Sequence, residues 1–562
     1  MVIFYLFRRC VTAPSYGHNV CLNAFQNLIY DEFEIDPEQE DYKSKIEMLA
    51  DKEYWAVLKP WEYWFARAAL RGGRTDVRCL YKKIDDADWD RGVRIHYRDI
   101  NSSYPFQQVK HAFPVGTPKI YIWDTKYRPC IAKTCVNTPD LTCDCSNEIK
   151  GDKNIKEKIM FEQWTVDQIL GMDDFFGFVC ATVKPPSNMY HPLLVHFDED
   201  QNKCIADCNE MTGVFTSVEF LRALEVGYEL IELKCFHKYQ KKHSFWGEII
   251  LDLYIEKMVN SKNEPTEEEL EKLADDFYEK FSEQVDENFG ELFREKILET
   301  SGRWGKNPAK KQTFKIVQNC LWGKHAEKPI QSQSEVLSFE HDLLRIMEIW
   351  ENCKQNRYTF DNAVPFGDSR VMYKFTPSGF ETSPDFHSKY LPAAVFVPAY
   401  GRLQLWEELY KIGKNVLMND TDSIVYVYDP DLNNEIPEGR LLGDWEAEGV
   451  ETDHGGIREF VGFGPKTYSI LCDDGYTSVK AKGVSLGYAT ESIVNHKVMA
   501  EEAKRVIAGE RPGVLKVPQT TFVYNHSKGI RTWKTLKDLK INVRDLKGDI
   551  KGAYLYPFGF NE

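Results

Sequence analysis

The stretch from Val416 to Val427 constrains this chain most, because two apolar runs flank an acidic turn. The runs are typical of strands and the turn, residues 419–423, is rich in turn-forming side chains, so the stretch predicts a β-hairpin. Asp420 and Asp422 lie at its tip. Ionised carboxylates beside buried strands are costly unless a divalent cation or a basic partner neutralises them. The tip is therefore either a cation site or a solvated turn, since Asp-rich turns are also common.

A second carboxylate interrupts the apolar face of an earlier strand. Ile95, Tyr97 and Asp99 share one face by the two-residue period of a strand. Pro105 ends the pairing, and the turn before it brings Tyr104 close to Asp99. The alternative is an aspartate that only caps a strand end. Asp99 meets the acidic hairpin only if these distant strands share one sheet.

A basic helix is predicted from residue 307 onward, because Asn307 suits the N-cap and Pro308 the first helical position. One stripe of this helix, at four-residue spacing, carries two ammonium groups, then an amide, then bare backbone. This order suits a polyphosphate followed by a flat base, although a solvated basic face is the commoner meaning. The stripe consists of Lys311, Lys315, Asn319 and Gly323.

Two further segments have features suited to a nucleic-acid backbone. Near the N-terminus, two glycines lie between arginines, where the chain can approach a polyanion closely. Near the C-terminus, lysines lie at strand edges beside an aromatic residue and a glycine. A tight surface turn and ordinary edge lysines are the alternatives. The residues are Arg71, Gly72, Gly73, Lys466, Tyr468 and Lys482.

The composition is that of a globular protein with several domains. The chain has 562 residues, of which 43% are hydrophobic, and a formal net charge of -16. Such a charge argues against coating nucleic acid through overall charge. No apolar run approaches the roughly 20 residues that span a bilayer. We therefore expect a soluble intracellular protein without a membrane partner, compatible with a nucleus, a mitochondrion or a virus-associated setting.

The 14 cysteines show no framework spacing, which indicates reduced thiols. One group is close enough in sequence to bind zinc, although its spacing is not a pair of CxxC motifs. Unpaired cysteines in an insertion are the alternative. The candidate zinc ligands are Cys130, Cys135, Cys143 and Cys145.

The order of these segments resembles family B DNA polymerases, and most closely the protein-primed branch of Polinton/Maverick elements, linear plasmids and some viruses. The resemblance rests on residues 70–75, 99–105, 307–324, 419–423 and 466–468, and on the long region between the motifs at 99 and 307. It implies template-directed addition of deoxynucleotides with two Mg²⁺ ions, for which Mn²⁺ can substitute. It also implies DNA template and primer, deoxynucleoside triphosphates and a terminal protein primer as partners.

The resemblance implies a role for each motif residue. Asp99, Asp420 and Asp422 would be catalytic, with Asp99, Asp422 and the Ile100 carbonyl as metal ligands. Nucleotide binding would fall to Tyr104, Lys311, Lys315 and Asn319. DNA binding would fall to Arg71, Gly72, Gly73, Gly323, Lys466, Tyr468 and Lys482.

The implied fold is α+β, a right-hand polymerase with an antiparallel palm sheet, helical fingers and a small thumb. Its parts are residues 1–73 as an N-terminal remnant leading to the Gly-Gly motif, 74–123 and 391–510 as the palm, 124–240 as an insertion resembling the terminal-protein region, 241–335 as the fingers, 336–390 as a connecting region and 511–562 as the thumb. The sequence before residue 72 contains no recognisable exonuclease motifs. We therefore expect a polymerase without proofreading or a truncated gene product.

The sequence departs from the family pattern at Ser103, Cys320, Trp322 and Met418, none of which is a metal ligand or a triphosphate lysine. The main rival is an inactive DNA-binding remnant of such a polymerase. An RNA-templated nucleotidyl transferase is a second rival. A metal-dependent nuclease is a third, and it would not need Lys311 and Lys315.

Overall fold

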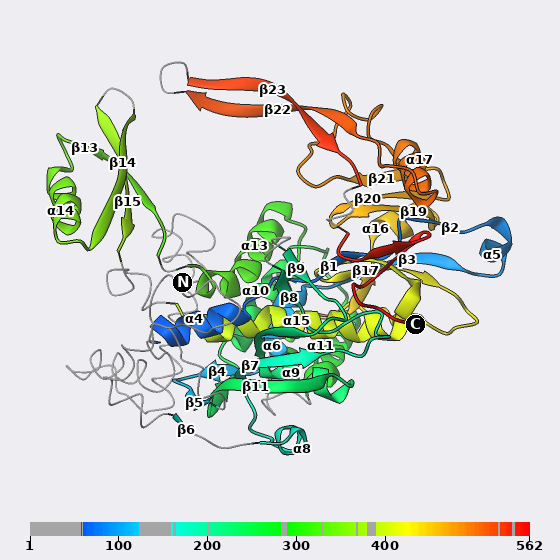
Figure 1. Cartoon of the computed structure of the whole chain (residues 1–562), viewed down its shortest axis with the longest axis horizontal. Helices are drawn as coiled ribbons and strands as arrows, with labels where there is room; N and C mark the ends of the chain where they lie inside the picture. The colour runs from blue at the N-terminus through cyan, green and yellow to red at the C-terminus, as the bar shows by residue number, and fades with distance from the viewer. Residues whose placement is uncertain are drawn as a thin grey trace.

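The computed structural model describes residue 58 and residues 60–122, 159–160, 164–198, 203–282, 289–328, 330–366, 369–378, 389–525, 529–541 and 546–562. In these ranges, antiparallel sheets alternate with helices along the chain (Figure 1). The predicted α+β class is confirmed. No helix in the described ranges has the length and hydropathy to cross a bilayer.

The largest sheet joins strands from two distant parts of the sequence. β3 (Arg94–Ile100) pairs antiparallel with β17 (Ser423–Tyr428), which forms the predicted hairpin with β16 (Val416–Asp420). Asp99 lies directly opposite Ser423, so the expectation of a shared sheet is confirmed. The sheet is completed by β1 (Thr75–Val77), β2 (Tyr81–Lys83), β18 (Trp445–Ala447), β19 (Ile457–Gly464), β20 (Thr467–Cys472) and β21 (Thr477–Lys480).

Both faces of this sheet are buried. The two-residue period of β17 sends Ile424 and Tyr426 toward Leu405 and Leu409 of the long helix α15 (Leu391–Ile412). The alternate residues of β17 enter a second core that includes Met499 of α17 (His496–Ile507). Burial on both sides explains why the hairpin reads as two nearly continuous apolar runs.

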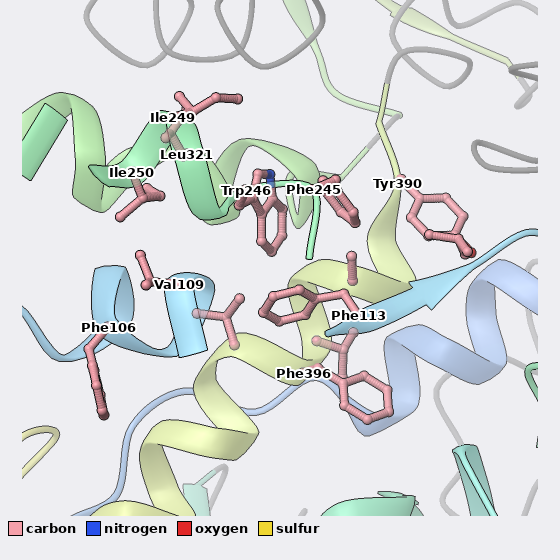
Figure 2. Packing of buried hydrophobic residues seen from close by; sticks show 14 of the residues in the cluster. Phe106, Val109, Phe113, Phe245, Trp246, Ile249, Ile250, Leu321, Tyr390 and Phe396 are labelled. Carbon is pink, nitrogen blue, oxygen red and sulfur yellow. The ribbon is translucent and has the colours of Figure 1, made fainter. Parts of the chain in front are cut away.

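A helical layer packs beside the sheet around an aromatic core (Figure 2). The core joins α6 (Ser103–Lys110), α10 (Gly247–Val259) and α13 (Pro308–His325) to α15. Each fully buried large side chain contributes about 1.5–3 kcal/mol. The core therefore fixes the three helices that surround the candidate site. Figure 2 shows Phe106, Val109, Phe113, Trp246, Ile250, Leu321 and Phe396 within it.

A second sheet lies below α15 in Figure 1 and contains five strands in the order β10-β7-β11-β5-β6. It begins with β5 (Lys119–Ile122), which pairs with β11 (Glu229–Lys238). β5 therefore lies just before residue 124, where the predicted insertion begins, although it pairs with a strand inside that insertion. Strand pairing across a long intervening segment leaves no local signal in the sequence. The other members are β6 (Ile159–Met160), β7 (Gly177–Lys184) and β10 (Met211–Thr216), with α8 (Val166–Leu170), α9 (Ser217–Glu225), β8 (His196–Asp198) and β9 (Lys203–Ile205) nearby in sequence.

Two peripheral units project at the top of the view in Figure 1. One is a small module with its own core, built from β13 (Gln333–Ser338), α14 (Leu343–Lys354), β14 (Tyr358–Phe366) and β15 (Arg370–Pro377). The other is a two-stranded ribbon of β22 (Leu515–Asn525) and β23 (Gly529–Leu539). The remaining elements are α4 (Pro60–Ala69), α5 (Asp86–Asp90), β4 (Phe113–Val115), β12 (Lys241–His243), α11 (Glu267–Phe281), α12 (Phe289–Leu298), the short 3-10 helix η3 (Gly413–Asn415), α16 (Gly449–Thr452), β24 (Asp549–Lys551) and β25 (Tyr554–Tyr556).

Candidate active site

The acidic tip is a tight turn held in place from outside the hairpin. Asp420 pairs with Ser423, and the amide of Asp422 donates to the Asp420 carbonyl at 2.7 Å. Thr421 has a φ of +63°, and its amide donates to the carbonyl of Arg74 at 2.7 Å. The segment before β1 therefore fixes the turn, and the two carboxylates lie on a rigid support.

Asp99 and Asp422 meet at the centre of the sheet. Asp99 is near the end of β3, and the next residue, Ile100, donates its amide to the Asp422 carbonyl at 2.8 Å. On the other side of β3, Glu446 of β18 lies opposite Asp99. Three acidic residues thus come from β3, from the turn between β16 and β17, and from β18.

The protonation equilibria reflect this crowding. Burial, and then the neighbouring charges of Asp422 and Glu448, raise the pKa of Asp99 to about 8. Burial and the charge of Asp420 raise the pKa of Asp422 to about 6. The positive charge of Lys315 opposes both shifts. The fold therefore holds carboxylates where their ionised forms need a further cation.

The donor atoms fit a hard divalent cation. Mg²⁺ and Mn²⁺ prefer carboxylate and carbonyl oxygens, which Asp99, Asp422 and Ile100 offer at the ends of adjoining strands. In the described ranges, no group of three or more His, Cys, Asp or Glu side chains has the arrangement of a metal site. A cation at this position would therefore complete its coordination with substrate oxygens or water, as Mg²⁺ commonly does.

Asp420 has different surroundings. Its Oδ1 atom lies 3.0 Å from the Lys466 ammonium and accepts hydrogen bonds from the hydroxyls of Thr421 and Thr75, at 3.1 and 3.3 Å. Although Asp420 is only two residues from Asp422, it belongs to the neighbouring ion pair with Lys466. Sequence reasoning grouped the two aspartates together.

The basic helix is α13, and it begins as predicted: the Asn307 side chain accepts from the Lys310 amide, and Pro308 occupies the first turn. Val317 and Leu321 face the core, whereas the predicted stripe points outward. Gly323 has open space where a Cβ atom would lie and does not line the cavity described below.

Tyr104 stands at the start of α6, between two close neighbours. Its ring makes an edge contact with Trp322 of α13, with centroids 5.1 Å apart. A Cβ atom on Gly401 of α15 would lie 3.2 Å from the Tyr104 ring, so a glycine there allows this ring position. The unusual Trp322 of the sequence thus packs against the tyrosine, which explains an indole on an otherwise polar helix face.

These groups share one cavity of about 1530 Å³. Six of the predicted side chains line it together with the Ile100 backbone. They are Asp99, Tyr104, Lys311, Lys315, Asn319 and Asp422. Acids on the sheet thus face amines on α13 across a space large enough for a nucleoside triphosphate and a base pair, since ligand sites commonly reach about 1,000 Å³.

Among the cavity residues that sequence reasoning missed are Lys257 and Glu446. Lys257 of α10 donates to the Ser102 hydroxyl at 2.5 Å. Burial and the charges of Lys315 and Lys311 lower the pKa of Lys257 to about 8. Neither residue stands in a recognisable motif: Lys257 is one lysine on an amphipathic helix, and Glu446 lies on a three-residue strand.

The Gly-Gly segment packs against the acidic turn. A Cβ atom on Gly73 would lie 2.9 Å from the Thr421 Cα atom, whereas Gly72 is exposed with open space around it. Arg71 points inward: its guanidinium lies 5.7 Å from the centre of the Phe215 ring, and burial lowers its pKa to about 10. Arg74 is also buried and paired with Asp76. The arginines therefore hold the segment in the fold, and only its backbone at Gly72 faces outward.

The predicted DNA-binding residues that follow the acidic turn in the sequence lie at increasing distance along the chain from it. They are Lys466, Tyr468 and Lys482. Lys466 contacts Asp420, and the Tyr468 hydroxyl lies 3.1 Å from that of Tyr97, two residues before Asp99. The Lys482 amide donates to the Thr467 hydroxyl at 3.2 Å, and its side chain is exposed. A surface path thus runs from the acidic tip past Lys466 to Lys482. The four candidate zinc ligands, residues 130 to 145, lie outside the described residues.

Comparison with known proteins finds a likeness among solved structures. No protein-family model matches the chain, and no curated protein matches it. A structure of Phi29 DNA polymerase complexed with primer-template DNA and incoming nucleotide substrates is similar, with 14% identity and a TM-score of 0.52 over 95% of this chain and 69% of that chain. The same polymerase in its post-translocation complex with primer-template DNA gives 14% identity and a TM-score of 0.49 over 92% of this chain and 70% of that chain. The fold of this chain is therefore similar to that of Phi29 DNA polymerase.

Proposed function

We propose that this chain is a DNA-directed DNA polymerase that adds deoxynucleotides to a 3′ end. One observation carries the proposal: Asp99 and Asp422 line the same cavity as Lys311, Lys315 and Tyr104. Nucleotidyl transfer needs oxygen ligands for divalent cations on one side and cationic groups for a triphosphate on the other. The likeness of the fold to Phi29 DNA polymerase supports the same reaction class.

Asp99, Asp422 and the Ile100 carbonyl would hold two Mg²⁺ ions, or Mn²⁺ in their place. When bound, such ions would make the attacking hydroxyl more acidic and would neutralise charge on the leaving oxygen. The chain supplies rigid positions for these oxygens, because the turn is fixed by the Arg74 carbonyl. Asp420 would act through Lys466: it lies 3.0 Å from the Lys466 ammonium, which would contact the primer terminus.

The amines would receive the incoming nucleotide. Lys315 and Lys311 would bind the triphosphate, and Lys257 would add a third amine from the facing helix α10. The Tyr104 ring would pack under the sugar and exclude a 2′-hydroxyl, since Trp322 and Gly401 fix its position. Asn319 would face the nascent base pair.

DNA would run on both sides of the acidic turn. Lys466, Tyr468 and Lys482 would hold the primer strand, and the backbone at Gly72 and Gly73 would guide the template, with Gly323 farther along α13. In this assignment the large sheet is the palm, the α10–α13 region is the fingers and the β22–β23 ribbon is the thumb. Initiation on the hydroxyl of a terminal protein would fit replication of a mobile element, plasmid or virus-like genome.

Primer extension by the purified chain tests the proposal. With Mg²⁺, the four deoxynucleotides and a primed DNA template, we expect extension that Asp422→Asn abolishes. RNA templates and ribonucleotides should be used poorly. This result would distinguish a DNA-directed DNA polymerase from an RNA-templated nucleotidyl transferase. A folded wild-type chain that binds primed DNA but adds nothing would contradict the proposal and favour a DNA-binding remnant.

A further inference from the structure

The loop that follows β21, residues 481–490, is anchored at several points. At its start, the Lys482 amide donates to the Thr467 hydroxyl, next to Lys466. In its middle, the Ser485 amide donates to the Gln519 side-chain oxygen at 2.7 Å, and the Gln519 amide group donates back to the Ser485 carbonyl at 3.1 Å. This 481–490 loop is therefore fixed between the acidic site and the base of the β22–β23 ribbon.

The end of the 481–490 loop is a locked turn. The Gly487 amide donates to the Thr490 hydroxyl at 2.9 Å, and the Thr490 amide donates to the Gly487 carbonyl at 2.8 Å. Thr490 itself is buried, so the turn is tied to the protein interior. Between them stands Tyr488, whose side chain is 96% exposed.

The Tyr488 ring is held out from the surface on a turn fixed by hydrogen bonds, so it is available to a partner. Leu486, two residues earlier, is also exposed at 36%. On the side toward the active site, Lys480 and Lys482 are exposed, and Lys537 of β23 donates to the Gly483 carbonyl at 2.5 Å. The loop therefore presents an apolar tip beside lysines, a combination suited to nucleic acid.

The side chains of the loop indicate a contact without sequence preference. The loop contains no Arg, Asn or Gln, and Lys482 is its one side chain of the kinds that commonly read base edges in a bidentate manner. An aromatic ring against sugars, with lysines on phosphates, holds any sequence equally well. A polymerase needs contacts that do not depend on base sequence along the duplex it has just made.

From these observations we infer that the 481–490 loop binds the duplex leaving the active site, with Tyr488 packed in its minor groove and Lys482 on a backbone phosphate. The inference rests on the proposed polymerase function, because it takes Lys466 and Tyr468 as the position of the primer terminus. It adds an aromatic DNA contact at Tyr488, outside the catalytic cavity, to the backbone contact already proposed for Lys482.

Equilibrium binding of primer-template DNA by Tyr488→Ala tests this inference. With a duplex of about 12 base pairs, the variant should bind at least about fivefold more weakly than wild type, as expected for loss of one aromatic contact. With a hairpin primer-template whose stem has only about 4 base pairs, about 14 Å long at about 3.4 Å per pair, the difference should vanish. Tyr488→Phe should bind both duplexes as wild type does, because the ring makes the contact.

Tyr410→Ala is the matched control, because Tyr410 is an exposed tyrosine on α15 outside this loop. It should leave DNA binding unchanged. Wild-type affinity of Tyr488→Ala for both duplexes would overturn the inference, and so would an equal loss for both, which would indicate damage to the primer site. Failure of the wild-type chain to extend any primer would instead count against the proposed function, so the two failures are distinguishable.

Discussion

The two aspartates of the acidic hairpin lie two residues apart, yet they belong to different regions of the site. Asp420 contacts the Lys466 ammonium at 3.0 Å and two threonine hydroxyls. Asp422 meets Asp99 in the cavity, and burial together with Asp420 raises its pKa to about 6. The Asp420 carboxylate is paired with a cation of the protein itself, whereas a bound cation would be needed to stabilise the ionised form of Asp422.

This difference shows how one turn serves two purposes. The paired side, with Asp420 and Lys466, is complete without a ligand. The unpaired side, with Asp99 and Asp422, stores an electrostatic cost that a bound cation would relieve, since opposite charge favours the ionised form. Chemistry is expected on the unpaired side, and positioning on the paired side.

The largest expected effect is on catalysis by Asp99→Asn. Loss of a metal ligand removes several kcal/mol of transition-state stabilisation, so single-turnover incorporation should fall by about 10³-fold or more. Glu446→Gln removes the carboxylate on β18 that lies opposite Asp99 of β3. This variant should lower single-turnover incorporation by less than about tenfold, because we assign Glu446 no ligand role. Equal losses in the two variants would contradict the assignment of Asp99.

Next in size is the effect of Lys315→Ala. This amine lies close enough to lower the pKa values of both cavity aspartates, and it would neutralise the triphosphate. We expect the incorporation rate per unit of nucleotide concentration to fall by about 10²-fold, the loss of one charged hydrogen bond of about 3 kcal/mol. Lys310→Ala, on the same helix but outside the cavity, is the control and should act like wild type.

The pH dependence of the free energy of unfolding should reveal the raised pKa of Asp99. Asp99 has a pKa of about 8 in the folded protein, so it keeps a proton that the unfolded chain releases near pH 4. The contribution of Asp99 to the free energy of unfolding of the metal-free protein should therefore fall as pH rises from about 4 to about 8, by at most a few kcal/mol. Burial lowers the pKa values of His111, His191 and His237, and these act in the opposite direction below about pH 6.5. Urea unfolding of both proteins isolates the Asp99 contribution: the free energy of unfolding of wild type should fall relative to that of Asp99→Asn across this range. A difference between the two that stays constant, or that changes in the opposite direction, would refute the shift.

The smallest effect concerns the support of the turn. Gly73→Ala would bring a methyl group within 2.9 Å of the Thr421 backbone, and overpacking of this kind costs about 1–3 kcal/mol. Gly72→Ala has open space and should stay within about 0.5 kcal/mol of wild type. Thermal unfolding of the two variants measures the difference. Equal stability would show that the turn does not depend on this contact.

The sequence predicted the parts of the site that carry local signals. The hairpin, the capped basic helix and the strand that ends at Asp99 follow from apolar periodicity, Asn307 and Pro308. Their convergence had no local signal: it was conditional on distant strands sharing one sheet, which the resemblance to family B polymerases implied.

Other features depend on tertiary contacts that leave no local pattern. Arg71 looked like a surface phosphate ligand, but its guanidinium lies against Phe215 inside the fold. Lys257 enters the cavity only because α10 packs beside α13. The division of labour between Asp420 and Asp422 depends on Lys466, which β20 brings to the turn from a different segment.

The most direct test compares single-turnover nucleotide incorporation by Asp422→Asn and Asp420→Asn at saturating primed DNA and Mg²⁺. Both variants should fold and bind DNA. We expect a loss of about 10³-fold or more for Asp422→Asn and about tenfold for Asp420→Asn, because only Asp422 would hold a metal while Asp420 would act through Lys466. Equal losses, or a larger loss for Asp420→Asn, would contradict it.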